Sequence, residues 1–236
     1  MRSGQGEADT LPHGDARSFF DAIAGHYDRV YALDGEEHRV RMRAVVRALG
    51  PPCEVLILGV GTGRELPALL DAGFRTTGVD CSDEMLARCA LRSRHGVLLR
   101  GDFWEKLPTA PHAFGAAIAL HGTFAHPPDV DAIGRAAGNL ARALVPGGTL
   151  YIELPTRAWF ARWAAAASGG PGSLIVDDDE AVFIDRRTGA ALRGRIVDPE
   201  AWLAPLEPYF ACTLQRMSDD ESAIVAVRRD GRPAAR

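Results

Sequence analysis

The hydrophobic positions of this chain fall into short continuous runs and helical spacings that follow one another in turn. The apolar run at residues 55–58 leads directly into three alternating glycines, Gly59, Gly61 and Gly63. A short apolar run bounded by glycine is typical of a buried parallel strand. Residues 65–72 then have helical spacing, so the glycines form a loop at the carboxyl end of a strand, where open α/β sheets bind ligands.

The same patterns continue through the rest of the chain. Further strands are predicted at 78–80, 97–99, 114–120 and 149–154, with helices starting near Ser82 and spanning about 129–144. Two apolar segments near the carboxyl terminus, 210–216 and 223–229, flank polar residues and predict an antiparallel hairpin. Strands that alternate with helices predict an α/β fold with a mainly parallel sheet.

Before the glycine loop, residues 16–33 place aromatic and aliphatic side chains at helical spacing and predict one amphipathic helix. A second helix is expected at 36–49, before Pro51 and Pro52. The first residues have no hydrophobic signal core and predict a disordered leader. The expected division is a leader (1–14), a helical cap (15–50) and an α/β domain (51–236).

Residues 155–206 are expected to form an insertion in this domain. A helix at 158–167 carries Trp159 and Trp163, and a glycine-rich break follows. Strands at 180–185 and 191–197 predict a hairpin within 173–197, acting as a lid or a homodimer contact. The acidic run at 177–180 lacks the alternating spacing of a calcium loop and is expected to be a solvated loop.

Composition excludes several classes of protein. The 236 residues suit one α/β domain with additions, and 47% of them are hydrophobic. A formal net charge of −4 disfavours nucleic acid as the main partner. No apolar run is long enough to cross a bilayer, so no membrane partner is expected. The four cysteines lack metal-ligand spacing, which indicates reduced thiols and a cytoplasmic protein.

The spacing of the glycines narrows the choice of ligand. A dinucleotide fingerprint would have its third glycine where Arg64 stands. The spacing found here, together with Asp80 at the next strand end, the Leu-x-Pro-Gly-Gly turn at 144–148 and the terminal hairpin, resembles class I S-adenosylmethionine-dependent methyltransferases. The resemblance covers about residues 15–230. It implies a doubly wound, seven-stranded, mostly parallel sheet with an antiparallel carboxyl-terminal hairpin, of the Rossmann-like methyltransferase fold.

The resemblance also implies a cofactor site for S-adenosylmethionine, with S-adenosylhomocysteine as product and no metal. Asp80 would bind the ribose hydroxyls, Asp102 the adenine amino group, and Phe103 would lie beside the ring. Tyr27 would close over the cofactor, since an aromatic face attracts a sulfonium. The expected cofactor-binding set is Tyr27, Gly59, Val60, Gly61, Gly63, Asp80, Cys81, Met85, Asp102, Phe103 and Leu120.

One position departs from the family pattern. Ile57 stands where the family often has an acidic residue near the methionine amine of the cofactor. Ile57 is then a core residue, and backbone carbonyls of the loop or Glu65 must accept hydrogen bonds from the amine. The departure keeps open a protein of this fold with different chemistry, or an inactive cofactor-binding subunit.

The segment after the strand at 114–120 supplies candidates for the chemistry. A hydroxyl or protonated amine acceptor benefits from a general base, and histidine titrates near neutral pH. His121 is the first candidate and His126 the second, although both also suit hydrogen bonds within the loop. For the substrate site, Phe124 is expected near the sulfonium or the acceptor. Trp159 and Trp163 are candidates for the acceptor pocket, with packing in a helix core as the alternative.

The sequence therefore predicts methyl transfer to an oxygen or nitrogen atom of a small metabolite or natural product. The expected partner is this small-molecule acceptor, and a homodimer is possible. A nicotinamide-dependent oxidoreductase is the alternative from another class. The glycine spacing, the Pro-Gly-Gly turn and the terminal hairpin all count against it.

Overall fold

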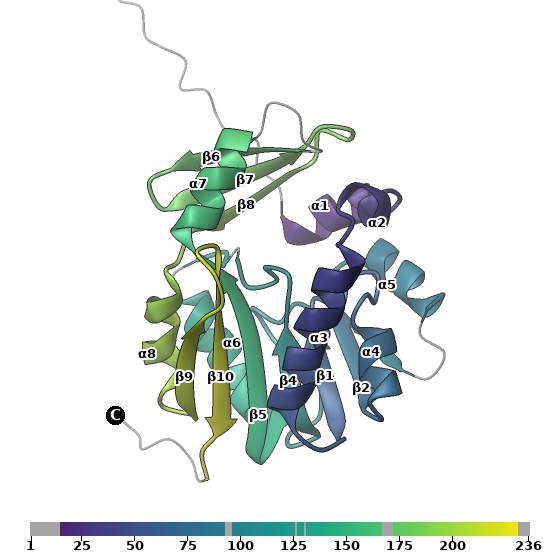
Figure 1. The fold of residues 1–236 in the computed structure, drawn as a ribbon, viewed down its shortest axis with the longest axis vertical. Coiled ribbons are helices and arrows are strands. Elements are labelled where there is room, and N and C mark those ends of the chain that lie inside the picture. Colours follow the sequence, from purple (N-terminus) through teal and green to yellow (C-terminus); the bar gives the residue numbers. More distant parts are fainter. Residues whose placement is uncertain (1–14, 93–95, 126, 130, 167–171, 231–236) are drawn as a thin grey trace, which may run out of the picture.

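A computed structural model describes residues 15–92, 96–125, 127–129, 131–166 and 172–230. Its centre is a seven-stranded sheet in the order β3-β2-β1-β4-β5-β10-β9 (Figure 1). The strands are β1 (Glu54–Leu58), β2 (Arg75–Asp80), β3 (Val97–Arg100), β4 (Phe114–Ala119), β5 (Leu144–Pro155), β9 (Phe210–Arg216) and β10 (Glu221–Arg228). Strand β10 runs antiparallel to both of its neighbours. The predicted fold class is confirmed.

The strand order places a ligand site at the middle of the sheet. β1 pairs in parallel with β2 on one side and with β4 on the other. The chain therefore moves outward from β1 in one direction and later returns to build in the other. Loops that follow β1 and β4 lie at this switch point, where open α/β sheets bind their ligands.

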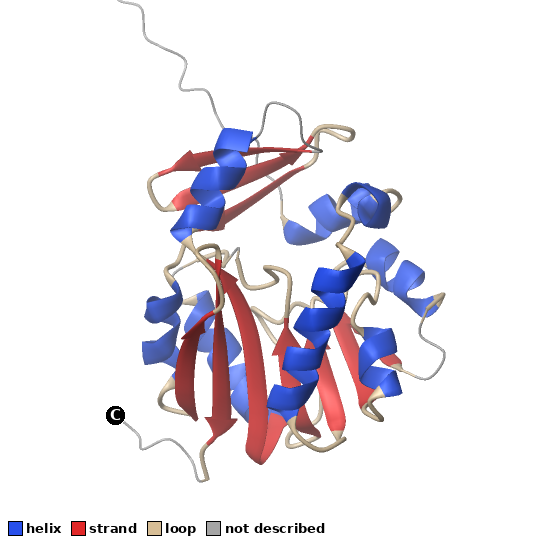
Figure 2. Cartoon of the chain, viewed as in Figure 1, coloured by secondary structure: helices blue, strands red, loops and turns tan. Residues whose placement is uncertain are grey.

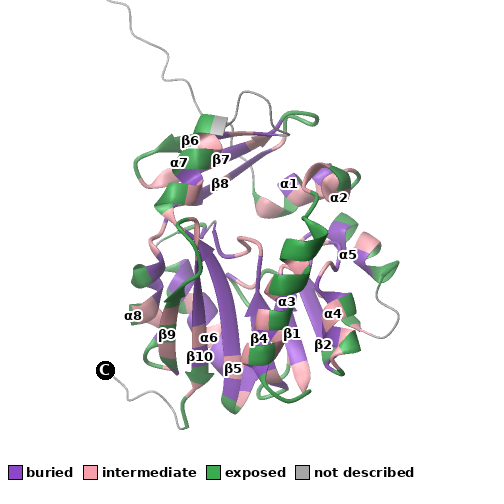
Figure 3. Cartoon of the chain, in the orientation of Figure 1, coloured by how far each residue is buried: buried purple, intermediate pink, exposed green. Residues whose placement is uncertain are grey.

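Helices cover both faces of the sheet, and the strands between them are buried (Figures 2 and 3). Helices α3 (Gly35–Leu49), α4 (Leu66–Asp71) and α5 (Asp83–Ala90) cover one face, and α6 (Ala132–Ala143) and α8 (Leu203–Leu206) cover the other. Successive β1 residues alternate between the two apolar clusters, Val55 and Ile57 in one and Leu56 and Leu58 in the other. This alternation explains the continuous apolar run, since both faces of the strand are buried.

β5 begins earlier than the predicted 149–154, because the Pro-Gly-Gly segment belongs to the strand. The pairing of β4 with β5 shifts register between Phe114 and Ala116. Gly147 has a φ of +75° in this irregular stretch, a conformation that glycine adopts at little cost. The segment is thus an irregular start to β5 rather than a turn in front of it.

The insertion contains a three-stranded sheet, so the predicted two-stranded hairpin was incomplete. Helix α7 (Arg157–Ala166) leads to β6 (Gly172–Asp177), β7 (Glu180–Asp185) and β8 (Ala191–Arg195), which pair antiparallel in that order. The acidic run is a tight β6–β7 turn in which Asp178 has a φ of +52°. Residues 167–171, part of the predicted glycine-rich break, lie outside the described residues. A short 3-10 helix, η1 (Pro199–Trp202), leads into α8.

The predicted helix at 16–33 was wrong in its length, because the chain breaks after Ile23. The cap consists of α1 (Ala16–Ile23) and a short α2 (Tyr27–Val30). Gly25 lies in the break, and glycine is a poor helix former. The break also brings His26 Nε2 within 3.2 Å of Asp185 Oδ2, on the insertion.

Both additions lie over the same end of the large sheet, the cap beside the insertion (Figure 1). The predicted leader, residues 1–14, lies outside the described residues. None of the helices in the described ranges is long and apolar enough to cross a membrane.

Candidate functional site

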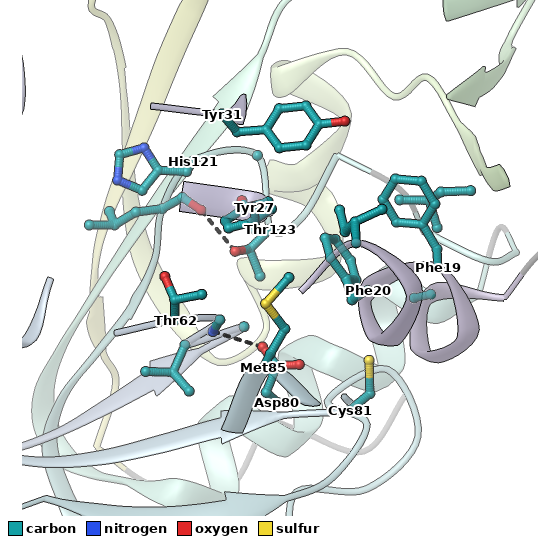
Figure 4. A pocket seen from close by; sticks show the side chains of 18 of the residues that line it. Phe19, Phe20, Tyr27, Tyr31, Thr62, Asp80, Cys81, Met85, His121 and Thr123 are labelled. Carbon is teal, nitrogen blue, oxygen red and sulfur yellow. Dashed lines mark hydrogen bonds between the residues drawn. The ribbon is translucent and has the colours of Figure 1, made fainter. Parts of the chain in front are cut away.

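A cavity of about 240 Å³ lies at the carboxyl end of the large sheet (Figure 4). Its walls come from the cap, the glycine loop, the segments that follow β2, β3 and β4, and the insertion. Most of the predicted site residues line it: Tyr27, Gly59, Val60, Gly61, Asp80, Cys81, Met85, Asp102, Phe103, Leu120, His121, Trp159 and Trp163. The structure thus brings together around one cavity residues that lie as far apart in the sequence as Tyr27 and Trp163.

The glycine loop needs glycine for different reasons at its three positions. Gly59, Gly61 and Gly63 have φ values of +58°, +52° and +80°, a region that other residues rarely adopt. A Cβ on Gly59 would lie 2.7 Å from Thr123 Cγ2, whereas one on Gly61 would meet nothing nearer than a carbonyl oxygen at 3.9 Å. Gly61 therefore presents bare backbone to the cavity.

Gly63 is not among the residues that line the cavity. A Cβ there would lie 2.7 Å from Cys89 Sγ, on α5, and 2.8 Å from Leu66 Cδ1. Its missing side chain lets the back of the loop pack against α5. The structure does not place Gly63 at the cavity as the sequence predicted: Thr62, Arg64 and Glu65 line it, whereas the Gly63 position faces Cys89 and Leu66.

Asp80 ends β2 and holds the glycine loop with its carboxylate. Oδ2 accepts the backbone N–H of Gly61 at 2.8 Å, and Oδ1 accepts that of Ser82 at 2.9 Å. Burial raises the pKa of Asp80, and the two amides oppose this effect. Each oxygen has a second acceptor direction, so a diol can still donate to the carboxylate.

Residues after β2 and β3 form the neighbouring wall. Asp102 accepts the backbone N–H of Trp104 at 2.9 Å, and the Phe103 ring lies 5.0 Å from that of Trp104. Burial raises the pKa of the Cys81 thiol to about 12. The thiol is therefore neutral at physiological pH and suits a packing contact rather than nucleophilic catalysis.

The residues expected to replace the missing acidic group can now be placed. Ile57 is 2% exposed in the core, and Glu65, which is 6% exposed, lines the cavity. His121 Nε2 lies 3.2 Å from Glu65 Oε1, but the two are not aligned for a hydrogen bond. Within the described part of the chain, this buried nitrogen has no hydrogen-bond partner.

A second charged residue of the loop, Arg64, was not recognised from the sequence as a site residue. Its guanidinium carbon lies 4.4 Å from the centre of the Tyr27 ring, and its Nε donates to Asp28 at 3.1 Å. Arg64 lines the cavity together with Tyr27. The Tyr-Asp pair in the cap was the available signal, because Asp28 is the residue that Arg64 contacts.

Asp28 joins the cap to the glycine loop. The Thr62 hydroxyl donates to Asp28 Oδ1 at 2.6 Å, and Arg64 and Arg92 donate to the same carboxylate. Burial opposes ionisation, but the hydrogen bonds from Thr62, Arg92 and Arg64 outweigh it and lower the pKa of Asp28. The carboxylate is therefore ionised and fixes α2 over the loop.

His121 follows β4 in a strained conformation. Its φ is +53°, and its backbone N–H donates to Glu153 Oε2 at 3.2 Å. Glu153 also accepts a hydrogen bond from Arg41 at 2.6 Å, and the His121 ring stacks on His38 with centroids 5.6 Å apart. The imidazole is thus fixed at the cavity wall. His126, the second candidate base, lies outside the described residues.

Of the three aromatic residues predicted for the substrate site, two line the cavity and one does not. Trp159 and Trp163 line the cavity. Phe124 does not: it is 1% exposed, with its ring 5.0 Å from those of Trp104 and Trp202. The expectation for Phe124 is corrected, because the turn after β4 directs it into the core on the α6 face. Four more aromatic residues, which the sequence did not identify as site residues, also line the cavity: Phe19, Phe20, Tyr31 and Phe183.

Among the described residues, no group of three or more His, Cys, Asp or Glu side chains could hold a metal ion.

Comparison with known proteins agrees with this geometry. Residues 55–148 match the family model described as a methyltransferase domain. The PH0226 protein of Pyrococcus horikoshii OT3 is similar in structure, with a TM-score of 0.69 and 18% identity over 86% of this chain and 99% of that chain. SAM-bound CalS10, an amino pentose methyltransferase from Micromonospora echinaspora involved in calicheamicin biosynthesis, has a TM-score of 0.61 and 16% identity over 94% and 100%. At these identities the likeness establishes a shared fold.

A shorter match is found in sequence. The 18S rRNA (guanine-N(7))-methyltransferase of Bos taurus is 36% identical over 69 residues, which are 29% of this chain. The matched part spans 25% of the length of that relative.

Proposed function

Because the chain carries a class I S-adenosylmethionine-dependent methyltransferase domain, we propose that it methylates an oxygen or nitrogen atom of a small molecule. One observation carries this proposal. The same cavity is lined by the glycine loop and Asp80 and by residues of the cap and the insertion, which form a chamber beside the cofactor residues. A cofactor site that shares a concave cavity with such a chamber suits a small acceptor.

The residues present fit the cofactor. Gly61 offers bare backbone, Asp80 offers two acceptor oxygens for the ribose, and the buried carboxylate of Glu65 replaces the acidic residue that Ile57 displaces. Tyr27 presents an aromatic ring, whose face attracts a sulfonium. Cys81, Met85, Asp102 and Phe103 would form the adenine side. When bound, S-adenosylmethionine supplies an electrophilic methyl group on positively charged sulfur.

The residues of this chain make three contributions to the reaction: they orient the acceptor, exclude water and accept a proton. The walls hold the acceptor in line with the methyl group, which removes much of the entropic cost of bringing two molecules together. The cap and the insertion exclude water that would compete as a nucleophile. His121 takes the proton that an O–H or N–H acceptor loses, since its Nε2 has no hydrogen-bond partner in the described structure.

A small molecule is favoured over nucleic acid by the cover on the chamber and by the net charge of −4. The amino pentose substrate named for CalS10 supports a natural product as one class of acceptor. The rRNA relative shares only 69 aligned residues with this chain, which are 29% of its length.

Calorimetry with S-adenosylmethionine, S-adenosylhomocysteine and NAD tests the cofactor, and mass spectrometry of a panel of small acceptors tests the reaction. We expect the two adenosyl ligands to bind and one acceptor to gain 14 mass units, the mass of an added methylene. Binding of NAD alone would refute the proposal. Tight cofactor binding without turnover of any acceptor, including rRNA, would support the alternative of an inactive or differently reacting protein.

A further inference from the structure

The chamber side of the cavity is lined by an aromatic wall from two separate parts of the chain. The wall comprises Phe19, Phe20 and Tyr31 of the cap and Trp159, Trp163 and Phe183 of the insertion. We propose that it binds an acceptor with a flat aromatic ring and no anionic group. This inference rests on the proposed function, whose acceptor it specifies.

The rings of the wall contact one another in sequence. Trp159 and Trp163 are parallel, with centroids 5.6 Å apart and planes within 13°, and Trp163 lies 4.7 Å from Phe183. Phe183 in turn contacts Phe19 at 5.5 Å and Tyr31 at 6.0 Å. The two tryptophans are only partly buried, although both line the cavity. The wall therefore offers a row of ring surfaces on which a further ring can stack.

No charged side chain of this wall faces the cavity. Among the described residues that line it, the acids and arginines are Arg64, Glu65, Asp80 and Asp102, all from the glycine loop and the strand ends. Arg64 is already paired with Asp28. Burying an unpaired charge is costly, and an aromatic face does not attract an anion, so an anionic acceptor would find no partner at the wall.

The carboxylate of Asp185, which contacts Tyr31 of the wall, already has hydrogen-bond partners on both oxygens. Asp185 is 0% exposed, and its Oδ2 accepts from the Tyr31 hydroxyl at 3.0 Å and contacts His26 at 3.2 Å. Its Oδ1 accepts from the Thr188 hydroxyl at 2.9 Å and from two backbone amides. Asp185 thus joins the cap to the insertion and is not free to bind an ammonium group.

Binding of three probes to the protein, with and without saturating S-adenosylhomocysteine, tests the inference by calorimetry. The probes are 2-naphthol, its saturated counterpart decahydro-2-naphthol, and the anion 2-naphthoate. Stacking of aromatic rings adds to the burial of apolar area, so we expect 2-naphthol to bind about tenfold more tightly than the saturated alcohol. Binding of 2-naphthoate should be weaker than that of 2-naphthol by at least as much.

Variants locate the binding. Trp159→Ala and Trp163→Ala should each weaken 2-naphthol binding about tenfold, and Trp163→Phe should retain most of it. Arg162→Ala, an exposed position on the same helix, is the matched control and should change nothing. Affinity for S-adenosylhomocysteine, measured in each variant, should stay at the wild-type value and shows that the fold is intact.

The inference is overturned if decahydro-2-naphthol or 2-naphthoate binds as tightly as 2-naphthol, if no probe binds saturably, or if both alanine variants bind 2-naphthol like the wild type. Failure of S-adenosylhomocysteine to bind would instead reject the proposed function. The two failures are distinguishable because each ligand is titrated separately.

Discussion

Asp80 and Gly61 are joined by a hydrogen bond, with 2.8 Å between the Oδ2 atom of one and the backbone nitrogen of the other. The contact connects the end of β2 to the glycine loop, which follows the neighbouring strand β1. The loop is therefore held in its binding shape by the protein itself. Preorganisation of this kind strengthens binding, because less ordering remains to be done when the ligand arrives.

Substitution of Asp80 tests its role as the ribose acceptor. Asp80→Asn keeps the shape of the side chain but removes the charge and one acceptor oxygen. Hydrogen bonds to charged groups are worth about 1.5–3 kcal/mol, so affinity for S-adenosylhomocysteine should fall about 10- to 100-fold in calorimetry. Asp83→Asn, an exposed position on α5, is the control. Wild-type affinity in the Asp80 variant would exclude the assigned role.

Two glycines of the loop should differ in their response to alanine. In Gly61→Ala the new Cβ has no close contact, and the cost comes from the φ of +52°, which is unfavourable for alanine. This substitution should lower the free energy of unfolding by about 1–2 kcal/mol. Gly59→Ala has similar strain and also places Cβ 2.7 Å from Thr123, so it should lose about 1–3 kcal/mol more. Chemical denaturation without ligand measures both.

The Gly59 clash has its own control. Thr123→Ala removes the Cγ2 and Oγ1 atoms that a Cβ on Gly59 would meet. In the double variant, the extra loss of Gly59→Ala should disappear, leaving the loss seen for Gly61→Ala. Equal losses for the two single variants would show that the contact with Thr123 does not constrain the loop.

Replacement of His121 tests the proton acceptor. His121→Asn should lower turnover of a hydroxyl acceptor by about 10²–10⁴-fold, the usual contribution of a general base. Affinity for S-adenosylhomocysteine should be unchanged. His112→Asn, which removes a ring that lies near the Leu144 carbonyl and away from the cavity lining, is the control. Wild-type turnover at every pH would remove His121 from the reaction.

The contacts of the cap with the rest of the molecule should weaken in acid. Burial opposes ionisation of Asp185, but hydrogen bonds from Thr188, His26 and Tyr31 outweigh it and lower its pKa below the ordinary 3.8. Between the two pKa values the unfolded chain binds more protons than the folded one, so stability rises with pH there. The stabilisation is complete above the ordinary pKa and is lost as the pH falls through the folded one.

Asp185→Asn isolates this contribution. The difference in unfolding free energy between wild type and variant should be constant from pH 7 to about pH 5 and should shrink toward pH 2. Hydrogen exchange of residues 16–31 should accelerate in the variant at neutral pH, because the link between cap and insertion is weakened. A difference that does not change with pH would show that ionisation of Asp185 does not stabilise the cap.

The sequence was most informative where short segments determine their own structure. The apolar run of β1 is buried on both faces, and the positive φ values at Gly59 and Gly61 select glycine whatever the rest of the chain does. Asp80 follows from the strand pattern alone. These local signals predicted the fold class and the group of residues around the glycine loop, because the order of elements limits how a parallel sheet can be connected.

The acceptor side could not be predicted in the same way. Tyr31 and Asp185 form a hydrogen bond although they are 154 positions apart in the chain. Phe19 and Phe20 have the spacing of an ordinary amphipathic helix, and no local pattern distinguishes a ring that lines a cavity from one that fills a core. The third strand of the insertion, β6, was missed because its sequence, GSLIVD, has an apolar run of only three residues and no alternation of apolar and polar positions.

The aromatic wall has a practical consequence for anyone who studies this molecule. The chain contains four tryptophans, and Trp104, Trp159 and Trp163 line the cavity whereas Trp202 is buried in the core. Three of the four indoles that can report by fluorescence therefore lie beside the ligand space. Binding of a ligand in the chamber can be followed by intrinsic tryptophan fluorescence, without a label or a chemical assay.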